Sequence, residues 1–192
     1  MERGNTLMGK RKPIILAFAG PNGSGKTTVT QRLPPVGTYV NADDIKKDHN
    51  LSDLEAAQKA EAIRCALLER NADFSFETVL STERNLLLLE KAKEQGYEVQ
   101  CIYVLTCDEN INVARVRARH IAGGHDVPED KVRTRYRRAL ALIPRLLKVC
   151  DKLLIYDNTE IPELLFDKNR GKNEIYPNKF WPESSIRKLL GL

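Results

Sequence analysis

Residues 20–28, GPNGSGKTT, constrain this chain more than any other segment. They satisfy the pattern G-x-x-x-x-G-K-[ST], in which glycines let successive backbone N–H groups turn toward one point and surround a phosphate. The apolar run at residues 13–19 precedes the loop and is typical of a buried parallel strand. A helix is expected to follow through about residue 33, where Pro34 and Pro35 stop it. The sequence therefore predicts a phosphate-binding loop (P-loop) between a strand and a helix.

Each residue type in the loop suits one part of a nucleotide. Lys26 is expected to reach the β- and γ-phosphates, Thr27 to hold Mg²⁺ through its hydroxyl, and Thr28 to contact the α-phosphate. The predicted ligands of ATP and Mg²⁺ are Gly20, Asn22, Gly23, Ser24, Gly25, Lys26, Thr27 and Thr28.

Strands and helices are expected to alternate through the rest of the chain. Further strands are predicted at residues 38–40, 74–80, 97–105 and 152–156. Helices are predicted from Ser52 toward residue 71, up to Gly96, after Asp108, and from Pro128 with a bend near Pro144. This alternation predicts one α/β domain over residues 1–192, with a five-stranded, mostly parallel sheet and helices on both faces.

The ends of the chain are expected to lie outside this sheet. Residues 1–12 are predicted to be a flexible extension, with Met8 as an alternative start. Residues 159–192 are predicted to form an appended hairpin, around residues 169–171, and a last helix from Glu183.

Composition excludes several classes of protein. No apolar run approaches the roughly 18 residues of a membrane span, and the four cysteines have neither disulfide-framework nor zinc-site spacing, so a cytoplasmic protein is expected. The net charge of +5 is compatible with binding to nucleic acid, but it is equally compatible with binding ATP and an anionic substrate.

Acidic residues lie at the ends of three predicted strands, where the ligands of a parallel sheet gather. Asp43 and Asp44 follow the second strand, and either helix capping or catalysis explains them. Glu77 lies in the third strand and favours a substrate hydroxyl, magnesium or arginine as its partner, unless it faces solvent. Asp157 ends the fifth strand and ranks third for the magnesium role.

Six of the arginines on the two helices that flank a break at residues 123–129 are candidates for binding phosphate. Arginine grips phosphate oxygens through a planar fork, and Gly123 and Gly124 supply a hinge, so this segment is predicted to be a mobile lid. Solvated helix faces are expected to explain half of the six, which are Arg115, Arg119, Arg133, Arg135, Arg137 and Arg138.

Taken together, these motifs resemble the zeta-toxin family of P-loop kinases, particularly its short bacterial members. The matching elements are, in order along residues 13–158, GPNGSGKTT, NADDI, FETVLS, GYEVQCIYV, RVRARHIAGGHDVPEDKVRTRYRRAL and YDN. The resemblance implies a fold close to nucleotide and shikimate kinases, with ATP and Mg²⁺. It also implies a hydroxyl of UDP-N-acetylglucosamine as phosphate acceptor, whose phosphorylation blocks wall synthesis, and it raises a protein antitoxin as a partner.

The same resemblance implies roles for individual residues. Asp43 corresponds to the catalytic base, Glu77 with Thr78 to substrate contacts, and Arg119 to the first lid arginine. Where typical toxins carry a second arginine before the lid proline, this chain has His125, and Arg135 is the alternative.

Two other functions remain open from the sequence. One is a nucleotide-binding switch or ATPase module without an organic acceptor. The other is a polynucleotide kinase or nucleic-acid-binding protein, against which the lid argues because Tyr136 is its only nearby aromatic.

Overall fold

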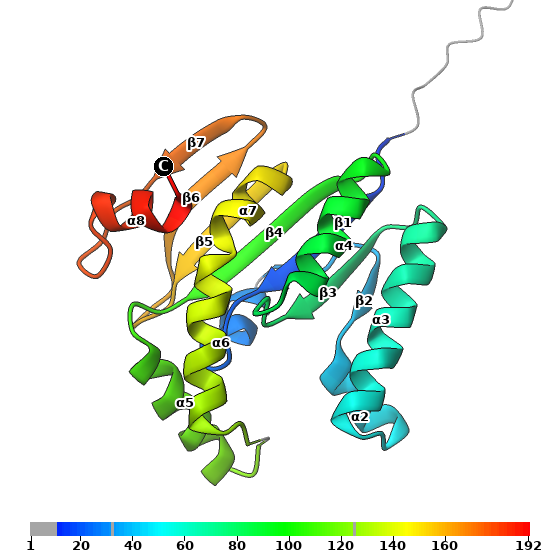
Figure 1. Ribbon diagram of the computed structural model, residues 1–192, viewed down its shortest axis with the longest axis horizontal. Coiled ribbons are helices and arrows are strands. Elements are labelled where there is room, and N and C mark those ends of the chain that lie inside the picture. The colour runs from blue at the N-terminus through cyan, green and yellow to red at the C-terminus, as the bar shows by residue number, and fades with distance from the viewer. Residues whose placement is uncertain (1–10, 32, 125) are drawn as a thin grey trace, which may run out of the picture.

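The computed structural model describes residues 11–31, 33–124 and 126–192 and contains one seven-stranded sheet (Figure 1). The strand order is β2-β3-β1-β4-β5-β6-β7, with the first five strands parallel and the last two antiparallel. The strands are β1 (Ile14–Ala19), β2 (Thr38–Val40), β3 (Phe74–Thr78), β4 (Glu98–Leu105), β5 (Lys152–Asp157), β6 (Glu163–Asn169) and β7 (Lys172–Ile175).

Eight helices accompany the sheet within the described residues. They are α1 (Lys26–Thr30), α2 (Ala42–His49), α3 (Asp53–Glu69), α4 (Glu83–Glu94), α5 (Glu109–Ile121), α6 (Glu129–Ala141), α7 (Ile143–Val149) and α8 (Glu183–Leu190). The predicted capping box of Ser52 and Glu55 begins α3, and the predicted bend near Pro144 is a break between α6 and α7.

The predicted strand count was wrong. The C-terminal hairpin is not outside the sheet, because β6 pairs antiparallel with β5 along its whole length and buries Leu165 and Phe166. These two apolar side chains extend the core past β5, so the sheet continues for two strands beyond the parallel part.

The helix after the phosphate loop is shorter than predicted and ends at Thr30. Its residues include the β-branched run Thr27 to Thr30, which has low helix propensity. Leu33 precedes a proline, which disfavours the helical conformation there. Of the predicted N-terminal extension, residues 1–10 lie outside the described residues, and Arg11 forms an ion pair with Asp73.

The two faces of the sheet are covered very differently. The larger hydrophobic cluster lies between one face and helices α2, α3, α4, α7 and α8. On the other face, α1 is the only described helix that contributes to the cluster of Leu16, Phe18, Val29, Ile102 and Val104.

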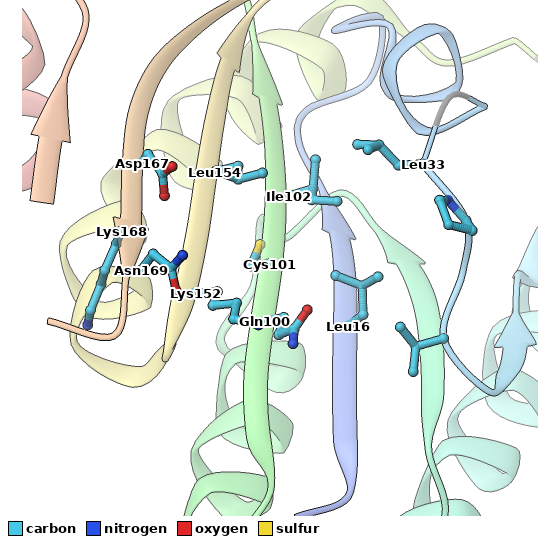
Figure 2. Close-up of a pocket in the computed structure, with 12 residues that line it drawn as sticks. Leu16, Leu33, Gln100, Cys101, Ile102, Lys152, Leu154, Asp167, Lys168 and Asn169 are labelled. Carbon is cyan, nitrogen blue, oxygen red and sulfur yellow. The ribbon is translucent and has the colours of Figure 1, made fainter. Parts of the chain in front are cut away.

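Part of that second face forms a hollow of about 320 Å³ (Figure 2). Leu16, Ile102 and Leu154 lie on its floor from β1, β4 and β5, and the segment around Leu33 forms one wall. Its lining includes no residue of the phosphate loop and none of the three acidic candidates, so this hollow is separate from the site described below.

The parallel strands end at one edge of the sheet, beyond which helices project from two sides. Helices α5 and α6 lie on one side of this edge, and α2 with α3 lie on the other (Figure 1). Helices α5 and α6 also pack on each other through Val116, Val127 and Val132. The predicted site residues all come from this edge and these helices.

Candidate nucleotide and acceptor site

The phosphate loop is held from outside by two buried asparagines. Asn112 of α5 donates its amide to the carbonyl of Asn22 at 2.6 Å, and Asn158, just after β5, donates to the carbonyl of Ser24 at 2.8 Å. These two residues, here called the amide pair, are 0% and 5% exposed. Because they bind the loop carbonyls, they favour the orientation that leaves the loop N–H groups to a phosphate.

Two glycines make this contact sterically feasible. A Cβ at Gly23 would lie 2.4 Å from the carbonyl oxygen of Asn112, and one at Gly25 would lie 2.1 Å from the amide nitrogen of Asn158. Both glycines also have positive φ, at 77° and 81°, which disfavours other residues. The glycines of the motif therefore serve the close approach of the amide pair as well as the turn.

Arg115 secures one half of the amide pair. Its guanidinium donates to the carbonyls of Asn158 at 2.8 Å and of Thr159 at 3.0 Å. From the sequence, Arg115 was expected only as one of the lid arginines, and neither Asn112 nor Asn158 was expected to bind the loop. A polar residue at position 112, one turn before the buried Val116, was the available signal.

Lys26 is the point where the predicted charges meet. Its ammonium donates to the carbonyl of Gly20 at 2.8 Å. Burial lowers its pKa, Glu77 and Asp43 raise it, and Arg119 lowers it, so all three charges act on this one group. Lys26 belongs to α1, and the three charged residues that act on it belong to β3, α2 and α5, which are far apart in sequence.

Glu77 lies on the α1 side of the sheet and accepts two hydrogen bonds on one oxygen. Its Oε2 accepts from Asn41 Nδ2 at 3.0 Å and from the Tyr39 hydroxyl at 3.2 Å. Burial and the Glu77 charge raise the pKa of Tyr39 to about 12, so the phenol stays a donor at neutral pH. The alternative of a Glu77 that merely faces solvent is not what the structure shows, since its side chain is partly buried.

Asp43 and Asp44 are exposed in the first turn of α2, and neither caps it. The cap is Asn41, whose Oδ1 accepts from the backbone N–H of Asp43 at 2.9 Å. The capping explanation for the two aspartates is therefore wrong. The charge of Asp43 acts on Lys26, whereas that of Asp44 acts on Tyr39.

Thr78 and Asp157 have partners within the fold. The Thr78 hydroxyl, on a residue 8% exposed, accepts from Leu80 N and from Asn85 Nδ2, and successive strand residues place it on the opposite face from Glu77. Asp157 is 2% exposed and accepts from Thr159 N and Asn178 Nδ2, each at 3.0 Å. The structure thus does not bring either side chain together with Lys26.

The lid arginines divide into two groups. Arg117 pairs with Glu129, Arg133 pairs with Glu129 and Glu109, and Arg137 pairs with Glu109. Arg135 instead donates to the Asn22 side chain in the phosphate loop at 3.3 Å.

The charge of Arg119 acts on Lys26. Of the two arginines chosen from the sequence, Arg135 therefore contacts the phosphate loop directly, whereas Arg119, exposed on the other lid helix, acts on it through its charge. His125, the other candidate for the lid, lies outside the described residues.

The described residues contain no group of three or more His, Cys, Asp or Glu side chains arranged to hold a metal ion. The Thr27 hydroxyl is exposed at the start of α1, beside Lys26. This arrangement suits Mg²⁺, which binds proteins through few ligands together with substrate phosphates and water. Within the described chain, no helix has the length and apolar character needed to cross a membrane.

Comparisons with known proteins agree with this geometry. The sequence pattern of the Zeta toxin family matches residues 2–180. An uncharacterized protein of Haemophilus influenzae is 32% identical over 125 residues, which cover 62% of this chain and 89% of that protein.

Two solved structures share the fold. One is from the PezAT chromosomal toxin–antitoxin system of Streptococcus pneumoniae, with a TM-score of 0.61 and 16% identity over 85% of this chain and 75% of the other. The second is the AvrRxo1-ORF1:-ORF2 complex with ATP, with a TM-score of 0.71 and 14% identity over 93% of this chain and 64% of the other. This chain thus spans slightly less than two thirds of the AvrRxo1 chain that it matches.

The P-loop α/β fold predicted from the sequence is confirmed, as is the family resemblance drawn from its motifs. With the family pattern covering most of its length, the chain belongs to the Zeta toxin family.

Proposed function

We propose that this protein transfers the γ-phosphoryl group of ATP to a hydroxyl group of a small molecule. The observation that carries the proposal is the Glu77 carboxylate held by Asn41 and Tyr39, whose charge acts on Lys26 together with the charges of Asp43 and Arg119. A phosphate loop alone binds a nucleotide, whereas carboxylates whose charges reach its lysine give an acceptor hydroxyl somewhere to bind. The ATP present in the AvrRxo1-ORF1:-ORF2 structure supports the same nucleotide here.

In this proposal each side chain has one task. Lys26 holds the β- and γ-phosphate oxygens, and Arg119 and Arg135 neutralise the charge that spreads over the transferred group. Glu77 holds the acceptor, and Asp43 accepts the proton of the reacting hydroxyl. That oxygen bonds to the γ-phosphorus as the bond to the ADP oxygen breaks.

Mg²⁺ would supply further charge neutralisation when bound with ATP. Thr27 is its ligand from the loop, and Asp43 or Glu77 lies nearby. Asp157 is a poor candidate, because both of its oxygens already accept hydrogen bonds within the fold.

UDP-N-acetylglucosamine is the acceptor that family membership suggests first. A protein antitoxin is the corresponding partner, since the PezAT structure comes from a toxin–antitoxin system. We place the protein in the cytoplasm, where both ATP and a sugar nucleotide are available.

The competing function is an ATPase or switch without an organic acceptor. It explains Lys26 and the loop, but it gives Glu77 and its two donors no task. A polynucleotide kinase is a third candidate, and Tyr136, the aromatic residue of the lid, is unavailable for base stacking because it is buried and donates to the carbonyl of Thr106 at 2.7 Å.

The proposal is tested by Asp43→Asn with Asp44→Asn as the matched control. Wild type is incubated with ATP, Mg²⁺ and either UDP-N-acetylglucosamine or a metabolite extract, and products are identified by mass spectrometry. Asp43→Asn should lower transfer at least about 100-fold with little change in ATP affinity, because only the charge and basicity are lost. Asp44→Asn should stay near wild type.

Two results would count against the assignment. If Asp44→Asn is inactive while Asp43→Asn is not, the base is the neighbouring residue. If Asp157→Asn alone inactivates a protein that circular dichroism shows to be folded, the acceptor mechanism is wrong.

A further inference from the structure

Asn41 is bonded to both halves of the acceptor side at once. Its Oδ1 accepts from the Asp43 backbone N–H at 2.9 Å, and its Nδ2 donates to Glu77 Oε2 at 3.0 Å. Asp43 begins α2 and Glu77 lies near the end of β3, 34 positions further along the chain. A single partly buried amide thus fixes the start of one helix relative to a carboxylate on another element.

The second donor to Glu77 is itself held in place. The Tyr39 ring packs edge-on against Phe18 of β1, with ring centroids 6.2 Å apart. Asn41 and Tyr39 both donate to Oε2, and the described residues place no donor on Oε1. The carboxylate is therefore oriented through one oxygen and keeps the other for a ligand.

We propose that Asn41 is a positioning residue that sets the separation of Glu77 from Asp43, and so aligns an acceptor held at Glu77 with the carboxylate of Asp43. This inference rests on the proposed function.

The need for one donor and one acceptor explains why an amide stands at position 41. Serine would cap α2 equally well but is too short to bridge to Glu77, and aspartate would cap the helix but repel Glu77. The two functions of Asn41 can therefore be separated by substitution.

The test is a double-mutant cycle between Asn41→Asp and Glu77→Gln, measured with Mg²⁺, ATP and UDP-N-acetylglucosamine. In the wild-type background, Asn41→Asp should lower kcat about tenfold and raise the acceptor KM, with the ATP KM unchanged. The new carboxylate still caps α2, but it repels Glu77 where the amide donated a hydrogen bond to it. In the Glu77→Gln background the same substitution should lower kcat less than about twofold, since the new amide can donate to the new carboxylate. Asn173→Asp, an exposed position on β7, controls for the added charge.

The inference would be overturned if Asn41→Asp lowered kcat by the same factor with Glu77 and with Gln at position 77. It would also be overturned if Asn41→Asp and Asn41→Ser both kept the wild-type acceptor KM. Thermal unfolding of the four proteins in the cycle supplies a readout that needs no acceptor, and additive melting temperatures would show that the two side chains do not interact. Failure of the proposed function itself is distinguishable, since wild type would then phosphorylate no organic acceptor at all.

Discussion

The phosphate loop is held in shape by buried side chains, whereas the acceptor side is built from exposed and half-buried ones. On the phosphate side, backbone carbonyls are fixed by the amide pair, Asn112 and Asn158. On the acceptor side, Asp43 is exposed, and Glu77 depends on two side-chain donors.

This contrast separates binding from selectivity. Buried, fully hydrogen-bonded groups are costly to change, so one side can serve a common nucleotide with little variation. Exposed side chains can be exchanged at small cost to stability, so the acceptor side is where related proteins can differ in substrate.

The largest effect is expected from the phosphate side. Lys26→Ala should lower nucleotide turnover about 100- to 1,000-fold, because it removes the cation aimed at the transferred phosphate. The fold should survive, since within the described part of the chain the ammonium donates only to the Gly20 and Pro21 carbonyls. A turnover assay with circular dichroism measures both, and undiminished turnover would refute the assignment.

A smaller effect is expected from the amide pair. Asn112→Ala should weaken ATP binding about tenfold and reduce the free energy of unfolding by about 1–3 kcal/mol, because the Asn22 carbonyl loses a buried donor. Asn110→Ala is the matched control, since Asn110 is exposed on the same helix. Calorimetric titration measures the ATP affinity, and chemical denaturation measures the free energy of unfolding. If Asn112→Ala and Asn110→Ala gave the same two values, the loop would keep its shape without Asn112.

Nucleotide binding is expected to change hydrogen exchange at the tip of the lid more than at its base. At the base of the lid, Asn112 of α5 binds the phosphate loop and Tyr136 of α6 binds the Thr106 carbonyl after β4, whereas Arg119 and Ile121 near the tip are exposed. Hydrogen exchange should therefore slow on addition of a non-hydrolysable ATP analogue in peptides covering residues 117–131, and change little in residues 109–115. Equal protection with and without the analogue would exclude a closing lid.

The smallest effect is expected from the arginine pairs on the outer face of the lid. Arg137 and Arg133 lower the pKa of Glu109 from its ordinary 4.5. A lowered carboxyl pKa stabilises the fold above the ordinary value, and this contribution is lost as pH falls through the lowered pKa. Glu109→Gln should cost at most about 1 kcal/mol at pH 7 and nothing well below pH 4, because Arg137 is largely solvated and Arg133 keeps its second partner, Glu129.

Thermal melts against pH measure this, with Glu94→Gln as the control. Glu94 is exposed at the end of α4. A difference between wild type and Glu109→Gln that persists at low pH would show a packing effect in place of the ion pairs.

Local patterns predicted most of the fold. The apolar run before the loop became β1, the Ser52–Glu55 spacing became a capping box, and residues 38–40 became β2. What local patterns missed was pairing over distance, since β6 joins the sheet only through β5 and the buried Leu165 and Phe166.

In the site too, local patterns were predictable from the sequence, whereas contacts between distant residues were not. The sequence motif identified the loop, and family resemblance selected Asp43, Glu77, Arg119 and Arg135, all of which lie on the loop side of the molecule. It missed the amide pair, because those side chains bind backbone carbonyls 90 and 134 residues away. It also missed Asn41, whose bond to Glu77 forms only where β2 and β3 lie side by side.

The fate of the γ-phosphoryl group tests the central claim most directly. Wild type is incubated with Mg²⁺ and γ-labelled ATP, with and without UDP-N-acetylglucosamine or a metabolite extract, and the labelled products are separated. We expect the label in an organic phosphate ester that forms only with acceptor and is lost in Asp43→Asn. Label found solely in inorganic phosphate, at a rate that no acceptor changes, would contradict the claim and identify an ATPase.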